Sequence, residues 1–326
     1  MPKSHFIREL KPNQVVKSFF LVHNKEIRTK KTGEEYLSLT LTDRTGTLDA
    51  MMWDGVPEVR DAFDRDDFVE AKGLVQVHRN KMQMIVHTLR RLDDSRVELA
   101  DYLPHTDQNI DELWTELRAA VAAMGNAHLR ALVGAFLDDP EIARLYRLAP
   151  AAKTLHHARL GGLLEHVVSL VRLCRLIAGH YQFIDLDLLV TAAVLHDLGK
   201  IWELDYQRSF GYTTAGQLLG HINMAADLLA SKAAAVPGFP PRLRILVEHM
   251  ILSHHGRYEF GSPRLPMFPE ALLFHYLDDL DSKLESMRAT LANDPNIAGC
   301  WTSYNPSLER PLLKKDKFLN DDGGSD

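Results

Sequence analysis

Hydrophobic and polar residues alternate along the first 95 residues in short runs separated by turn sequences. In the segment YLSLTLTD, Leu37, Leu39 and Leu41 alternate with more polar neighbours, which is the pattern of a half-buried β-strand. The turn sequences KKTGEE and RTGT flank this segment. We expect strands in the sequences VVKSFFLVHNKEIRT, YLSLTLTD, LDAMMWD, FVEAKGLVQVHRN and KMQMIVHTLRRL. Together they predict a closed, five-stranded β-barrel.

Further features of this region indicate the type of barrel. Residues 56–66 predict a short helix or loop between the third and fourth strands. Gly73 indicates a β-bulge in the fourth strand, and Arg79-Asn80 indicates a tight turn into the fifth. Five short strands with an insert after the third describe an OB-fold, which we assign to residues 1–95.

From about residue 96 onward, hydrophobic residues recur with the period of α-helices. Gly199 ends one helical segment at a position where a C-cap belongs, and Thr213-Thr214 can cap the start of another. We expect helices from 111 to the Gly125-Asn126 break and over 162–180, 186–198, 214–235, 241–255 and 269–292. The pattern predicts an all-α bundle, divided into a helical linker region (96–155), a helical domain (156–295) and a C-terminal tail (296–326).

Histidine and aspartate residues recur in a fixed order inside or at the ends of these apolar helices. A polar side chain in such a segment is costly to bury unless it is hydrogen-bonded or binds a metal. The positions are His166, His196, Asp197, His221, His254, His255 and Asp278. One such histidine alone is usually a satisfied core residue, but several helices that each bring such groups inward build a metal centre. Imidazole with carboxylate suits a divalent transition metal, and a shared carboxylate suits two.

The order H…HD…D resembles the metal-binding signature of the HD phosphohydrolase superfamily. The surrounding sequences HHARLGGLLEHV, LHDLGKIWEL, LLGHI, ILSHHGRYEFGSPRLPMFPEA and LDDLDSKL are similar to those of bacterial YhaM-type 3′→5′ exoribonucleases. That family joins an N-terminal OB-fold to an HD domain, so the resemblance covers nearly the whole chain. It implies that Asp278 is a metal ligand within a D-x-x-D pattern, with Asp281 as the alternative. His156 and His157 precede GGLLEH and are left open as residues that face the site.

Phosphodiester hydrolysis requires neutralisation of the phosphate charge and a hydroxide at neutral pH, and two metal ions a few ångströms apart provide both. We expect Asp197 to bridge two ions, with Mn²⁺ as the first choice and Fe, Co or Mg as alternatives. The other ligands form two groups, which are His166, His196 and Asp278 around one ion and His221, His254 and His255 around the other.

Cationic residues near these ligands are candidates for binding phosphate. Lys200 follows Asp197 by three residues, and we expect it to contact the substrate as a point charge and to act with Asp197 in catalysis. The alternative for Lys200 is an exposed lysine that stabilises a helix end. Arg257 and Arg264 are further candidates for phosphate contacts.

The barrel indicates the kind of substrate. OB-folds bind single-stranded nucleic acid by stacking bases on aromatic side chains beside a basic groove. We expect Tyr36 and Trp53 to be such aromatics, with Lys25 and Arg28 beside them. A place in the barrel core is the alternative for both aromatics and the expectation for Phe20. Stacking does not depend on the sugar, so it does not separate RNA from DNA.

Charge and composition exclude other classes of protein. Residues 1–95 carry a net charge of +1 and the remainder carries −7, which is unlike a clamp for duplex DNA. The sequence has no run of about 18 apolar residues that would span a membrane. The N-terminal MPKSHFIREL lacks the apolar core of a secretory signal. Cys174 and Cys300 cannot form a disulfide framework, so we expect a cytoplasmic protein with no membrane partner.

These observations predict a metal-dependent 3′→5′ exoribonuclease that acts on single-stranded RNA, with single-stranded DNA as a further substrate. The polarity and the preference for RNA are implied by the resemblance alone. One alternative is an HD-type nucleotidase or cyclic-nucleotide phosphodiesterase with a regulatory OB-fold. Another is a non-catalytic single-strand-binding protein with a decayed HD domain, although the intact set of ligands argues against decay. Assembly into a homo-oligomer is left open.

Overall fold

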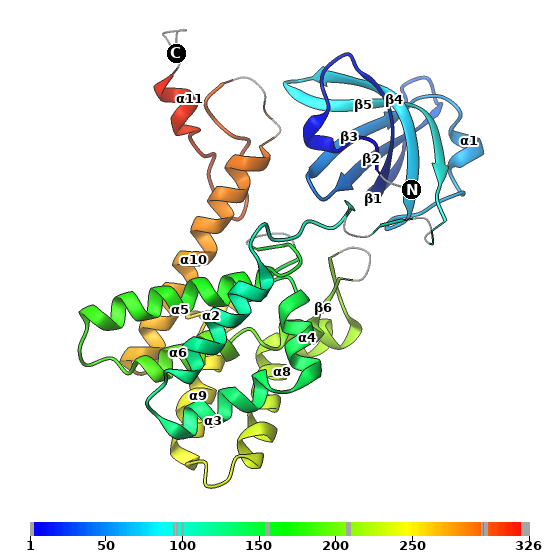
Figure 1. Ribbon diagram of the computed structural model, residues 1–326. Helices are drawn as coiled ribbons and strands as arrows, with labels where there is room; N and C mark the ends of the chain where they lie inside the picture. The colour runs from blue at the N-terminus through cyan, green and yellow to red at the C-terminus, as the bar shows by residue number, and fades with distance from the viewer. Residues whose placement is uncertain are drawn as a thin grey trace. The chain divides into compact units, whose positions relative to one another are not determined.

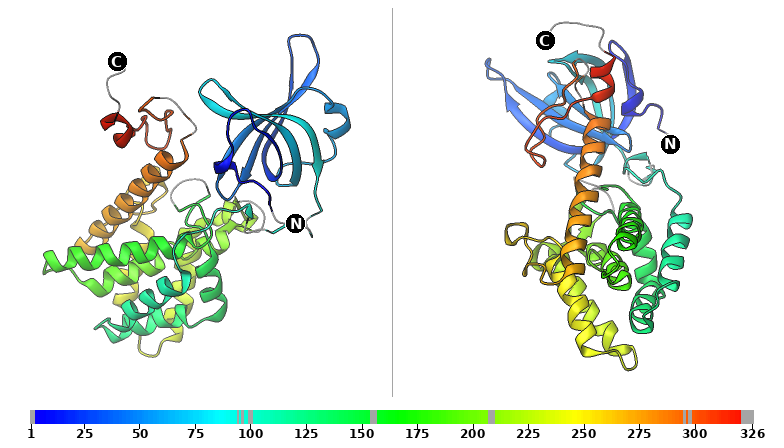
Figure 2. Two further views of the ribbon diagram at one scale, coloured as in Figure 1. Left: turned by 45° about the horizontal axis from the view of Figure 1, so that its top comes forward. Right: turned by 90° about the vertical axis from the view of Figure 1, so that its left-hand side faces the viewer.

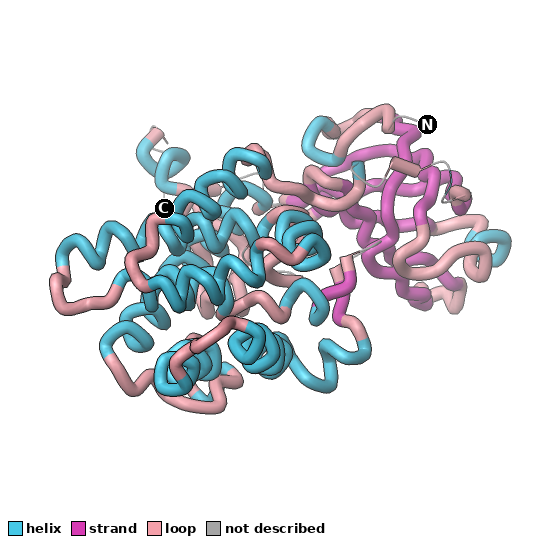
Figure 3. Tube along the Cα trace, turned by 60° about the horizontal axis from the view of Figure 1, so that its bottom comes forward, coloured by secondary structure: helices cyan, strands magenta, loops and turns pink. Residues whose placement is uncertain are grey.

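The computed structural model describes residues 3–93, 95, 97–98, 101–153, 157–206, 210–294, 296 and 299–320. The chain divides into two compact units, of which the first comprises Met1–Pro104 with Met287–Asp326 and the second comprises His105–Ser286. The long strands lie in the first unit, and the second is mostly helical (Figure 3). None of the described helices combines the length and the apolar character that crossing a membrane requires.

The first unit contains a closed barrel of five strands (Figure 1). The strands are β1 (Val15–Thr29), β2 (Glu35–Asp43), β3 (Gly46–Met52), β4 (Phe68–His78) and β5 (Lys81–Arg91). Their order around the barrel is β1-β2-β3-β5-β4, and β4 pairs with β1 to close it. The β3–β5 pair is parallel and the other pairs are antiparallel. This closed arrangement, with helix α1 (Val56–Val59) between β3 and β4, confirms the expected OB-fold.

The alternation of side chains and a tightly packed glycine shape the barrel. Leu37, Leu39 and Leu41 of β2 are buried in the barrel core, as the sequence pattern predicts. The register of the β4–β5 pair shifts at Gly73, where the bulge was expected. A Cβ atom at Gly73 would lie 2.2 Å from the carbonyl oxygen of Ile85, so a side chain at this position would push β5 away.

A tight turn connects β4 to β5. Arg79 and Asn80 have φ angles of 49° and 61°, and two consecutive left-handed residues are typical of a two-residue hairpin turn. The tight turn predicted at these residues is therefore present.

Near the C-terminus, antiparallel bridges join Trp301 to Leu313 and Asn305 to Arg310, and the short helix α11 (Lys315–Leu319) follows.

The second unit is a bundle of helices, seen from two further directions in Figure 2. They are α2 (Ile110–Ala122), α3 (Ala127–Leu137), α4 (Pro140–Leu148), α5 (Gly162–His180), α6 (Leu186–Leu195), α7 (Lys200–Glu203), α8 (Thr214–Ala235), α9 (Pro241–Ser253) and α10 (Pro269–Asn293), the last of which continues into the first unit. Short strands β6 (Leu204–Asp205) and β7 (Gly211–Tyr212) pair between α7 and α8. N-cap side chains accept backbone N–H groups at the starts of α2, α3, α4, α6 and α8, and these caps are Asn109, Asn126, Asp139, Asp185 and Thr213.

Helix α6 lies in the core of this bundle. Its residues from Leu188 to Leu195 are all buried, and it packs against α3, α5 and α9. A helix that is apolar on every side is stable only in such a position. The turn that follows α6 is therefore also held in the interior.

The expectation that Gly199 caps a helix over 186–198 is wrong. Helix α6 ends at Leu195, and Gly199 has φ −59° and ψ −21°, which is ordinary right-handed backbone rather than a left-handed cap. A Cβ atom at Gly199 would lie 2.1 Å from the backbone oxygen of His221. The glycine is required because the turn after α6 and helix α8 approach each other at backbone distance.

Candidate metal centre

All of the expected ligands lie in the second unit, on segments that are far apart in the sequence. They are His166 in α5, His196 and Asp197 in the turn after α6, His221 in α8, His254 and His255 at the end of α9, and Asp278 in α10. His221 directly follows Gly220, where α8 is kinked with φ 72° and ψ 151°. Helix ends and the kink thus place polar side chains in an otherwise apolar interior.

Each histidine of this set has a hydrogen-bond acceptor at Nδ1. The distances are 2.8 Å from His166 to Asp281 Oδ2, 3.1 Å from His196 to the Ala193 oxygen, 3.1 Å from His221 to Glu203 Oε1, 2.7 Å from His254 to the Ile251 oxygen and 2.7 Å from His255 to the Phe260 oxygen. A neutral imidazole that donates from Nδ1 carries its lone pair on Nε2, and metal-binding histidines are oriented in this way. The rings therefore turn Nε2 toward the centre. Burial alone would lower the pKa of His166, but Asp278 and Asp281 raise it to about 9, so a metal ion at this ring would have to displace a proton.

Several buried polar atoms in this interior lack a hydrogen-bond partner among the described residues. They are Nε2 of His196, His221 and His254 and Oδ1 of Asp197. A buried polar atom without a partner costs about 1–3 kcal/mol, and more when the group is charged. The three Nε2 atoms each lie 3.3–3.7 Å from an oxygen of Asp197, and such lone pairs suit divalent transition metals, which would satisfy them.

The first group of ligand atoms lies between α5, the turn after α6, and α10. His166, His196 and Asp197 offer ligand atoms within 4.8 Å of one another. Asp278 Oδ1 lies 3.1 Å from His166 Nε2 and 3.8 Å from His196 Nε2. His196 Nε2 lies 3.3 Å from Asp197 Oδ2.

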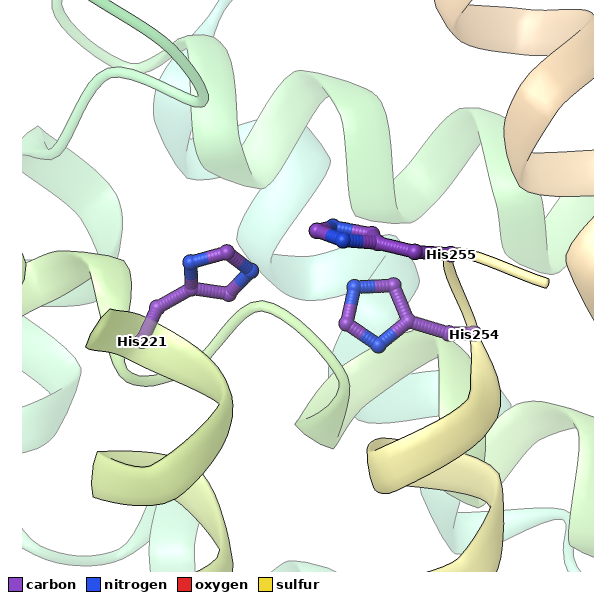
Figure 4. Close-up of side chains that lie close together, drawn as sticks. All are labelled: His221, His254 and His255. Carbon is purple, nitrogen blue, oxygen red and sulfur yellow. The ribbon is translucent and has the colours of Figure 1, made fainter. Parts of the chain in front are cut away.

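The second group consists of His221, His254 and His255, whose ligand atoms also lie within 4.8 Å of one another. Their rings, which extend from α8 and from the end of α9, face each other across a small space (Figure 4). Asp197 Oδ1 lies 3.4 Å from His221 Nε2 and 3.7 Å from His254 Nε2. The two oxygens of Asp197 thus face the two groups separately.

Asp197 is ionised in spite of its burial. Burial alone would raise the pKa of Asp197, but the Lys200 ammonium and His196 outweigh this and hold the pKa well below its usual value. Lys200 Nζ lies 2.6 Å from Asp197 Oδ2. Lys200 is only 9% exposed, so the alternative of an exposed lysine at a helix end is wrong.

The histidines at the end of α9 are neutral at neutral pH. Burial lowers the pKa of His254 well below its usual value, and His255 and His196 lower it further. Burial, followed by His221, also lowers the pKa of His255. These imidazoles can therefore act as metal ligands without first losing a proton.

The two aspartates of α10 take different positions around His166. Asp278 faces Nε2 of His166, whereas Asp281 accepts the Nδ1 proton and also accepts from Ser169 Oγ at 2.5 Å. This places Asp278 on the ligand side of the ring and Asp281 behind it. His157, left open from the sequence, is buried, and its Nε2 lies 3.4 Å from Asp281 Oδ2. His156 lies outside the described residues.

Sequence reasoning missed the groups that orient the ligands. Glu203 Oε1 accepts both the backbone N–H of His221 at 3.0 Å and its Nδ1–H at 3.1 Å. Arg159 forms a two-pronged ion pair with Glu165, at 2.9 Å and 2.8 Å, beside His157. The only available signal was the position of Glu203 and Glu165 within apolar segments, where a carboxylate needs a partner.

The arginines proposed to bind phosphate are both exposed. The Arg257 guanidinium lies 5.7 Å from the centre of the Phe260 ring, and Phe260 is the residue whose carbonyl group holds His255. Arg264 lies close to His249, and burial together with Arg264 lowers the pKa of His249. His249 is not one of the clustered histidines.

On the barrel, Tyr36 and Trp53 are outside the core and stack on each other. Their ring centres are 4.6 Å apart with an interplanar angle of 27°, and Trp53 is 38% exposed. The Lys30 ammonium lies 5.9 Å from the Trp53 ring, and Arg28 is exposed and bonded to Glu26. This surface combines stacked aromatics with cations, as nucleic-acid-binding barrels do.

Two other barrel residues have side chains that are largely covered. Phe20 is fully buried in the core, as expected. The Lys25 ammonium is also enclosed, because it donates to the carbonyl oxygens of Arg60 and Phe63 and lies 4.5 Å from the Phe63 ring centre. The expected surface position of Lys25 beside the aromatics is therefore not observed. Its ammonium instead links β1 to the segment after α1 through these hydrogen bonds.

A closed OB-fold barrel together with a helical unit that gathers histidine and aspartate ligands defines an HD phosphohydrolase with a nucleic-acid-binding barrel. The chain matches the HD domain family over residues 163–283 and the OB-fold nucleic acid binding domain family over residues 21–92. It is 34% identical over 260 residues to the 3′-5′ exoribonuclease YhaM of Geobacillus sp. (strain WCH70), with 79% of each chain covered. The chain belongs to the YhaM family of 3′-5′ exoribonucleases.

Solved structures of OB-fold proteins are similar to the chain at a lower level. The second OB-fold domain of replication protein A from Methanococcus maripaludis is 22% identical and covers 29% of this chain and 98% of its own, with a TM-score of 0.24. The single-stranded DNA-binding protein of Thermus aquaticus is 18% identical and covers 26% of this chain and 43% of its own, also with a TM-score of 0.24. Similarities of this size add nothing to the family assignment.

Proposed function

We propose that this chain is a metal-dependent 3′→5′ exoribonuclease that hydrolyses phosphodiester bonds of single-stranded RNA. The observation that carries the proposal is the convergence of buried atoms without hydrogen-bond partners, Nε2 of three histidines and one carboxylate oxygen, in an HD-type helical unit. Membership of the YhaM family supports the polarity and the preference for RNA.

The ligand atoms fall into two groups, which supports a site for two ions. His166, His196 and Asp278 would hold one ion, and His221, His254 and His255 would hold the other. Asp197 would bind both, because its two oxygens face different groups. When bound, a pair of divalent ions supplies charge neutralisation at the phosphate and a hydroxide at neutral pH. Imidazole-rich ligands favour a transition metal, and we propose Mn²⁺, with Fe, Co or Mg as alternatives.

The remaining residues of the centre position these ligands and the substrate. Lys200 fixes Asp197 through the 2.6 Å ion pair and adds a positive charge that a phosphate at the centre would meet. Glu203 and Asp281 keep the Nδ1 protons of His221 and His166 in place, so that both rings present Nε2.

The barrel would bind the single strand. Bases would stack on the Tyr36–Trp53 pair while Arg28 and Lys30 neutralise phosphates. Because stacking does not depend on the sugar, single-stranded DNA is a further expected ligand. Lys25 has no part in this proposal, since its ammonium is enclosed.

Labelled oligonucleotides test this function. RNA and DNA oligomers labelled at the 5′ or the 3′ end would be incubated with Mn²⁺, Mg²⁺ or a chelator. We expect a ladder of shortening products from 5′-labelled RNA, immediate release of a labelled mononucleotide from 3′-labelled RNA, and no reaction with chelator. Hydrolysis of mononucleotides or cyclic nucleotides alone would contradict the proposal and favour a nucleotidase or phosphodiesterase.

A further inference from the structure

The loop between α9 and α10 exposes two aromatic side chains next to the metal centre. Tyr258 is 57% exposed and Phe260 is 56% exposed, and both belong to a short 3-10 helix, Tyr258–Phe260. Aromatic side chains that are exposed beside a candidate site are available to stack on a nucleic-acid base. The loop is also linked to the centre directly, because the Phe260 carbonyl oxygen accepts from His255 Nδ1 at 2.7 Å.

This loop is held firmly by its backbone and by one buried serine. Ser262 is 2% exposed, its hydroxyl donates to the Leu252 oxygen at 3.0 Å, and its N–H donates to the Arg257 oxygen at 3.2 Å. At the start of the loop, Gly256 has φ 73°, and a Cβ atom there would lie 2.2 Å from the His275 ring. The backbone is thus fixed while the aromatic rings project outward, which is the arrangement of a preformed binding surface.

Charge favours nucleic acid over an apolar partner. The Arg257 guanidinium lies 5.7 Å from the centre of the Phe260 ring, and Arg264 is exposed in the same loop. An aromatic ring with a cation beside it matches a nucleotide, which offers a flat base and a phosphate within one residue of chain.

We propose that Tyr258 and Phe260 form a platform on which the 3′-terminal bases of single-stranded RNA stack, with Arg257 contacting the adjoining phosphate. This inference rests on the proposed exoribonuclease function and names the residues that hold the end of the strand. The backbone that carries the Phe260 ring is hydrogen-bonded to His255, so a base stacked on this ring would lie beside the candidate metal centre. Stacking accepts every base, as an enzyme that shortens strands of any sequence requires.

Fluorescence of a 2-aminopurine at the 3′ end of an RNA oligomer tests the platform. Stacking quenches this fluorescence, and a chelator prevents hydrolysis during the measurement. We expect the full-length protein to quench the 3′-terminal probe, and Phe260→Ala and Tyr258→Ala each to reduce the quenching and to raise Kd roughly 5- to 150-fold. Phe260→Trp should restore quenching, whereas Phe260→Leu, which keeps an apolar side chain without a ring, should not.

Phe183 provides a matched control, because it is 71% exposed on the connection between α5 and α6. Phe183→Ala should quench and bind as the unmodified protein does. Metal content and melting temperature of the Phe260 variants show whether His255 and the loop are intact, since the contact to His255 comes from the backbone. Full quenching by Phe260→Ala and Tyr258→Ala, or by Phe260→Leu, would overturn the platform.

The two proposals fail in different ways. If the unmodified protein shortens RNA but the Tyr258 and Phe260 variants bind the probe unchanged, only the stacking platform is wrong. If the unmodified protein shortens no RNA with any of the metals, the exoribonuclease function and the platform both fail.

Discussion

In the helical unit, several candidate functional atoms are buried and have no hydrogen-bond partner among the described residues, whereas on the barrel the candidate side chains are exposed and already in contact with each other. His196, His254 and Asp197 are at most 3% exposed, and each keeps a polar atom without a hydrogen bond. Tyr36 and Trp53 lie partly in water and stack on each other. An interior with unsatisfied lone pairs is unstable without a ligand, while a stacked pair of surface rings is stable alone.

The two regions differ in how narrowly each one defines its ligand. The buried set specifies charge, ligand chemistry and position, because a cation within reach of these atoms would remove the cost of their burial. The barrel surface specifies a flat, polyanionic partner and little more. Changes at the metal centre should therefore have large effects, and changes on the barrel surface should have graded ones.

The largest effect is expected from Asp197→Ala. Removing the carboxylate that faces both groups should abolish metal binding and RNA hydrolysis, while the apolar core around α6 keeps the fold. Elemental analysis and a product ladder measure both consequences. Asp279→Ala is the matched control, because Asp279 pairs with Lys283 on α10 and is not one of the clustered carboxylates. Full metal content in a folded Asp197→Ala protein would contradict the assignment of Asp197.

A smaller effect is expected when the carboxylate that holds the Nδ1 proton of His221 is removed. Glu203→Ala should weaken metal binding about 10- to 100-fold, because His221 loses the acceptor that fixes its ring. Glu203→Gln should fall between this variant and the unmodified protein. Competition with a fluorescent chelator gives the affinities, and Glu248→Ala, which breaks only a surface pair with Arg244, is the control. Equal affinities for all three variants would show that Glu203 has no positioning role.

On the barrel, Trp53→Ala should cost about 1–3 kcal/mol of single-strand binding, nearly independent of base identity. Its melting temperature should change little, since Trp53 lies outside the barrel core. Phe20→Ala serves as the contrast, because deleting a fully buried ring costs about 3–5 kcal/mol of stability. Unchanged affinity in a folded Trp53→Ala protein would remove this ring from the binding surface.

The smallest effect is expected from a single cation. Arg28→Ala should reduce the slope of log affinity against log salt by about 0.7, as one lost phosphate contact on a single strand does. Lys25→Ala should leave this slope unchanged and lower the melting temperature, because its ammonium bonds to the carbonyl groups of Arg60 and Phe63. The opposite result, a changed slope for Lys25→Ala alone, would restore Lys25 to the binding surface.

Local patterns were sufficient for much of the fold. The alternation in β2, the Arg79-Asn80 turn and the Thr213 cap depend on neighbouring residues, so the sequence predicted them correctly. The role of Gly199 could not be read in this way. It depends on the approach of His221, which is distant in the sequence, and the isolated glycine looked like a helix end.

In the candidate site, too, some features could be predicted from local sequence and others depend on residues that are distant in the sequence. The order of histidines and aspartates indicated which side chains the structure brings together, because burial of such groups in apolar helices needs a reason. The sequence did not indicate that Asp281 sits behind His166 or that Lys25 is enclosed. Both features depend on contacts with residues that are distant in the sequence. The spacing of residues within one helix or strand does not determine such contacts.

The close approach of Gly199 to His221 also has a consequence for how this protein can vary. One close backbone contact joins the turn that carries His196 and Asp197 to the helix that carries His221. At this contact there is no room for a methyl group. Exchange of this glycine for any other residue would therefore shift the segments that carry both groups of candidate ligands in a single mutation. We therefore expect position 199 to accept no side chain in any variant that keeps both groups in place.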